Sequence, residues 1–314
     1  MFRRTPRIFA TTLAVAALAL GACAEKSSDD ASAPATGGTS AAAAFPATVG
    51  KLTLDKRPEK IVSLSPTATE MLFAIGAGKQ VTAADDNSNY PPDAPKSELS
   101  GFQPNAEAIA GKSPDLVVLA NDTNKIVEQL TTLKIPVLLT PAAATLEDSY
   151  RQIADLGTLT GHAAEAADVV TRMKDDIAKL TKDLPQRPEK LTYYHELGPE
   201  LYSATSKTFI GSIYALAGLE NIADASDADG RNGGYPQLSQ EIIVKANPDF
   251  VFLADTKCCK QSPETVKARS GWAGVTAVKN NQIVALDDDI ASRWGPRVVD
   301  LLRAVVDAVA KVPA

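Results

Sequence analysis

The 314-residue sequence has little cysteine and histidine, and this argues against several kinds of site. It contains three cysteines and two histidines. Besides Cys23, the cysteines are the adjacent pair Cys258-Cys259, so the CxxC spacing of redox and zinc motifs is absent. A bare zinc or manganese site needs several His or Cys ligands, so we expect none, nor any other resident cofactor. In an oxidising compartment the pair could form a strained vicinal disulfide or stay as two free thiols, and the sequence favours neither.

The motifs of common enzymes and nucleic-acid binders are also missing. The sequence has no G-x-S-x-G elbow, no Walker loop and no G-x-G-x-x-G fingerprint. Its acidic and serine residues are not paired with a histidine at a recognisable spacing. The net charge is −6 and no basic stripe is present, which argues against nucleic acid as a partner. We therefore expect no enzymatic activity, with an exported hydrolase as a remote alternative.

Long apolar runs are confined to the N-terminus, which has the pattern of an export signal. Three arginines precede an apolar stretch from Ile8 to Leu20, which is too short for a comfortable membrane span. It ends in Leu20-Gly21-Ala22-Cys23, which resembles the bacterial lipobox, with cleavage before Cys23 and lipid on its thiol. We predict a signal peptide over residues 1–22, and a lipidated cysteine with a disordered tether over 23–48. The protein would be exported and anchored to the outer face of the cytoplasmic membrane.

One sequence unit occurs twice, 134 residues apart. Residues 105–120 read NAEAIAGKSPDLVVLA and residues 239–254 read SQEIIVKANPDFVFLA, with identical residues at seven of the sixteen positions. Each copy predicts a short amphipathic helix, a Pro-Asp turn and a buried strand. A unit that occurs twice at so long an offset indicates two similar lobes, because solenoid repeats recur every 20–50 residues or so. A cleft between two lobes is where a small molecule would bind.

Strand patterns alternate with helix patterns on both sides of one long helix, which is the signature of an α/β fold. The strand at residues 61–64 is followed by Ser65 as a helix cap and Pro66 as the first helical residue. From His162 to Leu184 there is no proline or glycine, which predicts one rigid helix about 34 Å long. The predicted organisation is an N-terminal lobe (49–160), a connecting helix (161–185) and a C-terminal lobe (186–314), with the ligand cleft between the lobes.

Five segments carry a resemblance to a known family. They are the two repeats together with RPEKIVSLSPTATEMLFAIGAG (57–78), NYPPDA (89–94) and SRWGPRVVDLL (292–302). With them the chain resembles the substrate-binding lipoproteins of iron-siderophore, haem and vitamin B12 ABC importers, and most of all the vitamin B12-binding proteins. The resemblance implies a monomer that captures cobalamin or a related corrinoid and delivers it to an ABC permease and its ATPase. Capture of a ferric siderophore or haem is the alternative.

Ligands of open α/β sheets meet the loops beyond the carboxyl ends of the strands. Aromatic rings cover the broad apolar faces of a corrinoid or chelate well, and several of the few aromatics fall in such loops. The candidates in the first lobe are Ser65, Pro66, Tyr90, Phe102 and Asn121. Those in the second lobe, whose first strand we predict at residues 191–194, are His195, Glu196, Tyr202, Tyr235, Lys257 and the stretch from Asp288 to Trp294. We expect His195 to be a satisfied strand-end residue rather than a metal ligand.

The resemblance assigns more specific contacts to some of these residues. Tyr90 matches a ligand-contacting tyrosine, and Asp289 and Arg293 match the two ends of a ligand-contacting loop. Phe102 and Tyr235 stand where the vitamin B12-binding proteins often have tryptophan. Asn121 replaces an aromatic residue, and Trp294 could compensate for it.

Charged residues raise two further expectations. The resemblance implies that Glu107 and Glu241, one in each repeat, dock with arginines of the permease. Arg293, Trp294 and Arg297 would together suit an anionic siderophore or haem propionates. We expect Arg293 to lie in a loop and contact ligand, and Arg297 to lie inside the closing helix as a surface or structural residue.

Overall fold

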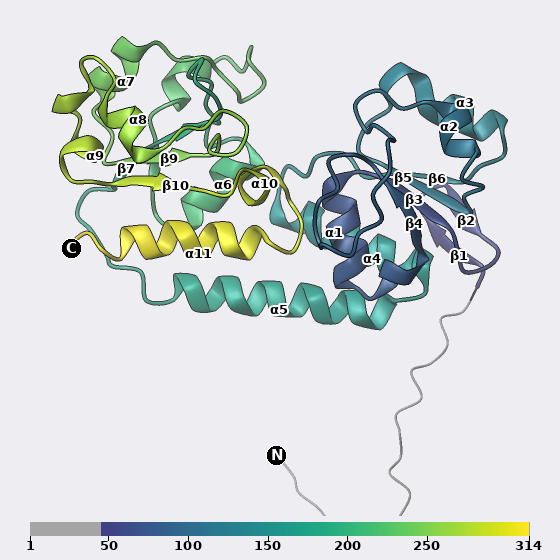
Figure 1. Cartoon of the computed structure of the whole chain (residues 1–314). Coiled ribbons are helices and arrows are strands. Elements are labelled where there is room, and N and C mark those ends of the chain that lie inside the picture. Colours follow the sequence, from purple (N-terminus) through teal and green to yellow (C-terminus); the bar gives the residue numbers. More distant parts are fainter. Residues whose placement is uncertain (1–44, 314) are drawn as a thin grey trace, which may run out of the picture. The chain divides into compact units, whose positions relative to one another are not determined.

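The computed structural model describes residues 45–313 (Figure 1). The predicted signal peptide, Cys23 and most of the predicted tether lie outside the described residues. Among the described residues, no helix has the length and apolar character needed to cross a membrane. Two four-stranded parallel sheets, each accompanied by helices, confirm the predicted α/β class. We call β1 to α4 the N-terminal lobe and β7 to α11 the C-terminal lobe; the lobe boundaries drawn from the sequence stay predictions.

The N-terminal lobe is built on a parallel sheet in the order β4-β3-β5-β6. Its two central strands, β3 and β5, are buried at every residue, as expected for parallel strands that helices cover on both faces. A small antiparallel hairpin, β1-β2, precedes this sheet. The elements of the lobe are β1 (Ala47–Val49), β2 (Leu52–Leu54), β3 (Ile61–Leu64), α1 (Pro66–Ala74), η1 (Ala77–Gln80), β4 (Val81–Ala84), α2 (Ala106–Ala110), β5 (Leu116–Leu119), η2 (Thr123–Lys125), α3 (Ile126–Thr132), β6 (Val137–Leu139) and α4 (Leu146–Thr160).

The C-terminal lobe repeats this topology. Its parallel sheet has the order β8-β7-β9-β10, so β7 takes the place of β3 and β9 that of β5. The elements of the lobe are β7 (Thr192–Glu196), α6 (Phe209–Leu216), β8 (Glu220–Asn221), η3 (Asp224–Asp227), α7 (Gln240–Ala246), β9 (Phe250–Leu253), α8 (Pro263–Lys267), η4 (Trp272–Gly274), α9 (Thr276–Lys279), β10 (Ile283–Ala285), α10 (Asp288–Ser292) and α11 (Val298–Val309).

The repeated Pro-Asp turn has the same structural role in both lobes. Asp115 accepts hydrogen bonds from the backbone N–H groups of Glu59 (2.9 Å) and Lys60 (3.0 Å), just before β3 begins. Asp249 accepts one from the N–H of Thr192 (2.8 Å), the first residue of β7. In each case the carboxylate satisfies backbone donors at the start of the central strand. The recurrence of the turn in the sequence therefore reflects a repeated structural role.

Helix α1 begins where the sequence predicts. Ser65 is its N-cap and accepts a hydrogen bond from the N–H of Ala68 at 3.2 Å, with Pro66 in the first turn. The helix stops before Gly76, whose φ of 86° favours glycine because other residues rarely adopt it. Its apolar side chains Met71 and Leu72, and Ile75 at its end, are fully buried.

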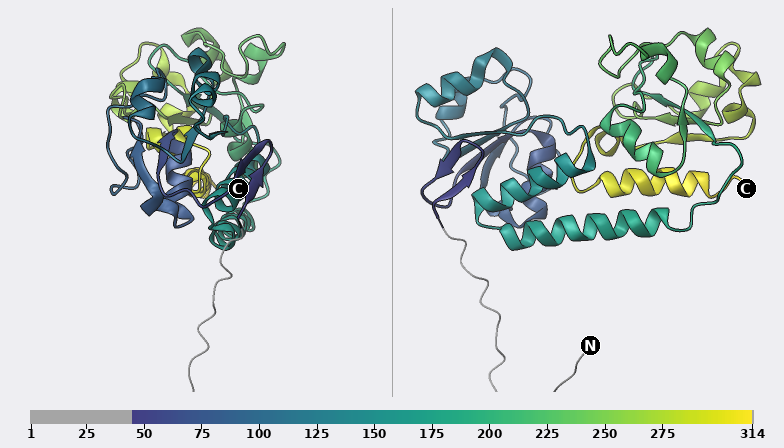
Figure 2. Two further views of the ribbon diagram at one scale, coloured as in Figure 1. Left: turned by 90° about the vertical axis from the view of Figure 1, so that its right-hand side faces the viewer. Right: turned by 180° about the vertical axis from the view of Figure 1, so that it is seen from behind.

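Helix α5 (Ala163–Thr181) follows the N-terminal lobe and leads toward β7. It is shorter than the predicted helix, because the chain turns after Lys182 and Leu184 lies outside it. Its inward face, made by Ala166, Val169, Met173 and Ile177, is buried. It packs against α4 of the N-terminal lobe and against α11 of the C-terminal lobe, and α5 and α11 lie side by side in Figures 1 and 2.

Candidate functional site

Four aromatic side chains predicted to contact ligand are exposed in the structure. The exposed fractions are 42% for Tyr90, 72% for Phe102, 45% for Tyr202 and 44% for Tyr235. They lie in connections that follow the carboxyl ends of β4, β7 and β8. Because large apolar side chains are usually buried, a set exposed at this end of both sheets is the kind of surface that a ligand would cover.

The structure brings some of these residues together and leaves others apart. Tyr202 pairs with Gln237 in an isolated antiparallel bridge, so the segments that carry Tyr202 and Tyr235 run side by side. The N–H of Ser203 also donates to the carbonyl of Pro236 at 3.0 Å. Within residues 45–313, no hydrogen bond joins Phe102 to this group.

Three other predicted contacts have local structural roles. Ser65 is 1% exposed and its hydroxyl is used in the cap of α1, while Pro66 beside it is half-buried. Asn121 is exposed, and its side-chain oxygen accepts hydrogen bonds from the N–H and the hydroxyl of Thr123. Ser65 is therefore not available to a ligand in this conformation, and Asn121 holds a turn after β5.

The expected ligand-contacting loop from Asp289 to Arg293 lies mostly within a short helix, α10, which is capped by the side chain of Asp287. Arg293 follows it and is 9% exposed. Its guanidinium donates to Glu70 Oε1 (2.7 Å), to Asp289 Oδ1 (2.7 Å) and to the carbonyl of Asn87 (3.1 Å). Three hydrogen bonds thus tie the guanidinium to groups within the protein, and the expectation that Arg293 contacts a ligand stays a prediction.

Asp289 lies at the centre of this polar group. Besides Arg293 it accepts hydrogen bonds from Lys257 Nζ (2.8 Å) and from the side-chain amide of Asn89 (3.0 Å). Partial burial raises the pKa of Asp289, but the Lys257 ammonium and the Arg293 guanidinium outweigh it and hold the pKa below its usual range. Asp289 is therefore an ionised carboxylate that links α10 to the segment containing Tyr90.

Glu70 on α1 is a member of this group that the sequence analysis missed. It is 3% exposed and accepts hydrogen bonds from Arg297 as well as Arg293. Arg297 is not inside the closing helix as expected, but is the N-cap residue of α11, with its guanidinium 4.0 Å from the centroid of the Tyr90 ring. A glutamate within the apolar segment TATEMLFAIGAG is the signal that could have identified Glu70.

Trp294 is also committed to contacts within the protein. Its indole N–H donates to Gln152 Oε1 at 2.8 Å, and its carbonyl accepts from the hydroxyl of Ser149 at 2.5 Å. Both partners lie on α4 of the N-terminal lobe. The expectation that Trp294 replaces a missing ligand-contacting aromatic stays a prediction.

The assignment of His195 and Glu196 to a loop was wrong. Strand β7 runs to Glu196, because His195 and Glu196 pair with Phe252 and Leu253 of β9, and both side chains are fully buried. His195 Nδ1 lies 2.8 Å from the hydroxyl of Tyr214, and burial lowers the pKa of His195 to about 4. It is therefore a neutral core residue that a ligand in the surface loops cannot reach.

Glu196 belongs to a buried ionic group at the carboxyl ends of β7 and β9. Its two oxygens accept from the two terminal nitrogens of Arg269 at 2.5 and 2.6 Å. Asp255 is also fully buried, and neither of its carboxyl oxygens has a hydrogen-bond donor. Burial and the neighbouring Glu196 charge raise the pKa of Asp255 to about 7. A proton on Asp255 would let it donate to Glu196.

The two cysteines of the adjacent pair are free thiols in the structure. The loop that carries them is fixed by Asp288, which accepts from the backbone N–H groups of Lys257 and Cys258, each at 2.9 Å. Burial and the neighbouring Cys259 raise the pKa of Cys258 to about 12, which keeps the thiol protonated. Among residues 45–313, no cluster of three or more His, Cys, Asp or Glu side chains could hold a metal ion.

The two glutamates predicted to dock with a permease occupy equivalent positions. Glu107 and Glu241 are each the second residue of a short helix, α2 and α7. The N-caps of these helices are Asn105 and Ser239, whose side chains accept the N–H three residues on. Both glutamates are exposed. Their role in docking stays a prediction.

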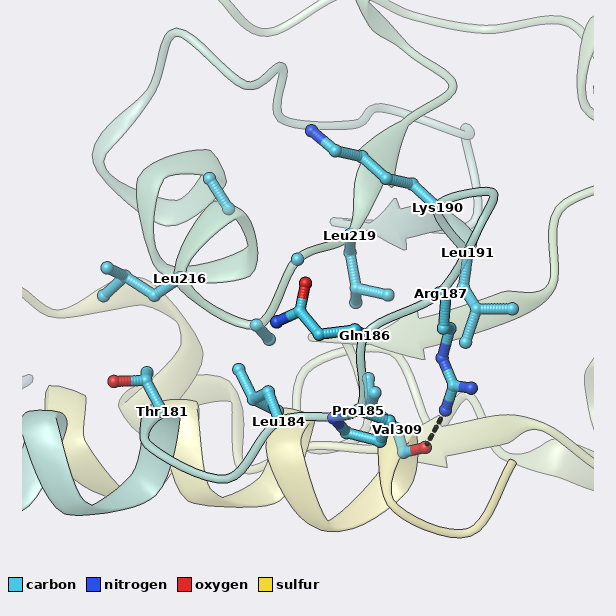
Figure 3. Close-up of a pocket in the computed structure, with 13 residues that line it drawn as sticks. Thr181, Leu184, Pro185, Gln186, Arg187, Lys190, Leu191, Leu216, Leu219 and Val309 are labelled. Atoms are coloured by element: carbon cyan, nitrogen blue, oxygen red, sulfur yellow. Dashed lines mark hydrogen bonds between the residues drawn. The ribbon is translucent and has the colours of Figure 1, made fainter. Parts of the chain in front are cut away.

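Two of the cavities in the described residues lie beside α11. One of about 290 Å³ is lined by Glu70, Phe73, Ala74, Tyr90, Pro91, Pro296 and Arg297. A second, of about 350 Å³, lies where the chain leaves α5, between the end of α6 and α11 (Figure 3). There Arg187 donates to the carbonyl groups of Val309 and Val312 at the end of α11, and none of the predicted ligand contacts lines this cavity.

Comparison with known proteins places the chain in a family. A family model described as "Periplasmic binding protein" matches residues 61–290. A "Cobalamin-binding protein" of Halobacterium salinarum is 32% identical over 268 residues, which cover 82% of this chain and 71% of that protein. An uncharacterised ABC transporter substrate-binding lipoprotein of Bacillus subtilis is 29% identical over 280 residues, covering 84% of this chain and 86% of that protein.

A solved structure has the same fold. The vitamin B12-binding protein of Vibrio cholerae is 23% identical, covers 81% of this chain and 99% of its own, and superposes with a TM-score of 0.64. Because the family model matches more than two-thirds of the sequence and the Halobacterium relative aligns over most of its length, this chain belongs to the periplasmic binding protein family.

Proposed function

We propose that this chain is the lipid-anchored, extracytoplasmic substrate-binding protein of an ABC importer, and that its ligand is cobalamin or a related corrinoid. The observation that carries the ligand class is the set of four exposed aromatic side chains beyond the carboxyl ends of the two sheets. Rings of this kind bury a large area at a low cost in conformational entropy, which suits the broad apolar faces of a corrin.

The relatives support the same proposal. Curated proteins similar to this chain are named for binding cobalamin or vitamin B12, and a similar Bacillus protein is named an ABC transporter lipoprotein. The lipobox-like Leu20-Gly21-Ala22-Cys23 agrees with such an anchor. Delivery to a permease and its ATPase, by a binding protein that acts as a monomer, follows from the proposed role.

Capture of haem or a ferric siderophore is the second candidate. Similar folds include the haem-binding protein of Roseiflexus and a Saccharomonospora protein of a ferric-hydroxamate transport system. Tyrosine can ligate haem iron, and three exposed tyrosines are available. Against this candidate, Arg293 and Arg297 are engaged by Glu70, and His195 is buried in β7.

Calorimetric titration of residues 24–314 with cyanocobalamin tests the proposal, with haem and a ferric hydroxamate as parallel probes. We expect saturable one-to-one binding of cyanocobalamin at micromolar concentration or tighter. Tyr202→Ala and Tyr235→Ala should each weaken it about tenfold or more, as loss of a central aromatic contact does. Leu133→Ala is the matched control, because Leu133 is equally exposed but lies at the end of α3.

If the protein binds haem or the ferric hydroxamate but does not bind cyanocobalamin, the result would support the second candidate function. No heat from any of the three probes would contradict both assignments. Equal losses of affinity for cyanocobalamin in Leu133→Ala and Tyr235→Ala would show that the exposed aromatic side chains do not form the ligand site.

A further inference from the structure

We propose that Glu70 is a positioning residue of the ligand site, which fixes Tyr90 through Arg297 and Asp289 through Arg293 without touching the ligand. This inference rests on the proposed function, because it takes Tyr90 and Asp289 as ligand contacts. The argument starts from the carboxylate and follows its two guanidinium partners outward to the segment that contains Tyr90.

Glu70 holds two arginines from a distant part of the chain. It projects from α1 and is 3% exposed. Its Oε1 accepts from Arg293 at 2.7 Å and from Arg297 at 2.5 Å, and its Oε2 accepts from Arg297 Nε at 2.9 Å. A carboxylate this deeply buried is retained only when it is paired, and here the pairing comes from the start of α11 and the residues before it.

The first branch leads to Tyr90. The guanidinium of Arg297 lies over the Tyr90 ring at 4.0 Å from its centroid, while 42% of Tyr90 remains exposed. The two-point contact with Glu70 fixes the plane of the guanidinium, since both Nε and one terminal nitrogen are bound. One face of the tyrosine is thus supported by a cation that Glu70 orients.

The second branch leads to Asp289 and returns to the same segment. Arg293 bonds both Glu70 and Asp289, and it also binds the carbonyl of Asn87. Asp289 in turn accepts the side-chain amide of Asn89, the residue before Tyr90, at 3.0 Å. The segment from Asn87 to Tyr90 is therefore held at three points by groups that depend on Glu70.

Charge balance favours this arrangement over a simple structural salt bridge. Glu70 and Asp289 supply two negative charges, and Arg293 and Arg297 supply two positive charges. Removing the Glu70 charge leaves Arg293 with Asp289 as its salt-bridge partner, but takes away the only carboxylate among residues 45–313 that forms a salt bridge with Arg297. The expected response is a displacement of Arg297, which contacts the Tyr90 ring directly.

The position of Tyr90 can be tested without any ligand by 19F NMR of protein labelled with 3-fluorotyrosine. The sequence has seven tyrosines, and the resonance that disappears in Tyr90→Phe identifies Tyr90. We expect Glu70→Gln and Arg297→Gln each to shift this resonance while the other six stay in place. Arg303→Gln, an exposed arginine on the same helix, is the matched control and should shift none.

The consequence for binding is measured with cyanocobalamin as the probe. We expect Glu70→Gln to weaken binding about tenfold in the wild-type background, but less than about threefold when Tyr90→Ala is already present, since coupled residues are not additive. Thermal unfolding of each variant shows whether the lower affinity comes from loss of folding. Arg297→Gln, at a half-buried helix cap, is the second variant and should lower the stability less than Glu70→Gln.

The outcomes separate this inference from the proposed function. An unmoved Tyr90 resonance in both Glu70→Gln and Arg297→Gln overturns the positioning role. Equal losses of affinity in the two backgrounds overturn the claim that Glu70 acts through Tyr90. If the wild-type protein does not bind cyanocobalamin, the corrinoid assignment fails, and the resonance of Tyr90 alone decides the positioning role.

Discussion

The two lobes share one topology but differ in the residue types that form their interiors. Their sheets have the same strand order, and the repeated Asp115 and Asp249 satisfy equivalent backbone donors. The four strands of the N-terminal sheet contain no aromatic residue, whereas β7 and β9 carry Tyr193, Tyr194, Phe250 and Phe252. The same arrangement of strands and helices therefore tolerates an aliphatic and an aromatic interior, provided that each is well packed.

The buried charges of the lobes differ in a way that bears on function. Glu196 of the C-terminal lobe is neutralised by Arg269 of the same lobe. Glu70 of the N-terminal lobe is neutralised by Arg293 and Arg297, which come from the C-terminal part of the chain. A change in the first group should affect the stability of one lobe, whereas a change in the second should also affect the segment that contains Tyr90.

The largest expected effect concerns the feature in which the lobes are most alike. Given the proposed function and the predicted docking, reversal of charge at both Glu107 and Glu241 should abolish cobalamin uptake by cells that carry the importer, because each lobe would then repel the predicted permease arginines. The affinity of the isolated protein for the ligand should stay unchanged, since both glutamates are exposed on short helices and neither is among the proposed ligand contacts.

The control for this test also has one residue in each lobe. Glu128 and Glu264 are exposed glutamates in the first turns of α3 and α8. Their double reversal changes the net charge equally and should leave uptake intact. Uptake that survives the first double reversal, or is lost equally in the control, would show that the repeated glutamates do not dock.

Arginine removal should distinguish the two buried carboxylates. Arg269→Gln leaves Glu196 and Asp255 buried together without a cation, which should lower the free energy of unfolding by about 3–5 kcal/mol. Arg297→Gln should lower it by roughly 1–2 kcal/mol, because Glu70 keeps Arg293 as a partner. Urea unfolding measures both; equal losses would contradict the different pairing of the two lobes.

Equivalent positions of the repeat allow the two interiors to be compared directly. Phe252 in β9 corresponds to Val118 in β5, and both side chains are fully buried. Phe252→Ala should lower the free energy of unfolding by about 3–5 kcal/mol and Val118→Ala by roughly 2 kcal/mol, in proportion to the apolar volume removed. A larger loss for Val118→Ala would mean that the aromatic interior repacks around its cavity.

The fold could be predicted because its signals are local. Alternation of strand and helix patterns, the cap at Ser65 and the repeat around Pro114-Asp115 each depend on residues near one another in the sequence. The exposed aromatics were identified for the same reason, since a loop position can be recognised from its neighbours. Even so, β7 was predicted two residues short at its carboxyl end, because its last pairs are with β9.

The polar part of the candidate site could not be predicted because its partners are far apart in the sequence. Arg293 and Glu70 are 223 residues apart, and Arg297 and Glu70 are 227 apart. Periodicity places Glu70 on a helix but does not show which residue neutralises it. The sequence therefore indicated Arg293 as a ligand contact but did not show that it pairs with Glu70 and Asp289.

A further expected effect is a pH dependence that originates in the C-terminal lobe. The pKa of Asp255 is raised in the folded protein, by burial and by Glu196, above the value of about 3.9 expected for an unfolded chain. Between these two values the folded state keeps a proton that the unfolded state has released. The unfolding free energy should therefore fall as the pH rises through this window, by no more than ~1.4 kcal/mol per pH unit, and level off above it.

Asp255→Asn tests this directly, because the amide can donate to Glu196 at every pH. Between pH 5 and pH 8 the variant should lose less stability than the wild type, as measured by urea unfolding at each pH. Asp288→Asn is the control: burial raises the pKa of Asp288, but backbone hydrogen bonds lower it overall, so its contribution is lost only at lower pH. Parallel pH profiles for wild type and Asp255→Asn would show that Asp255 carries no proton in the folded protein. Glu196 would then share Arg269 with a second buried charge, and the large cost predicted for Arg269→Gln would rise further.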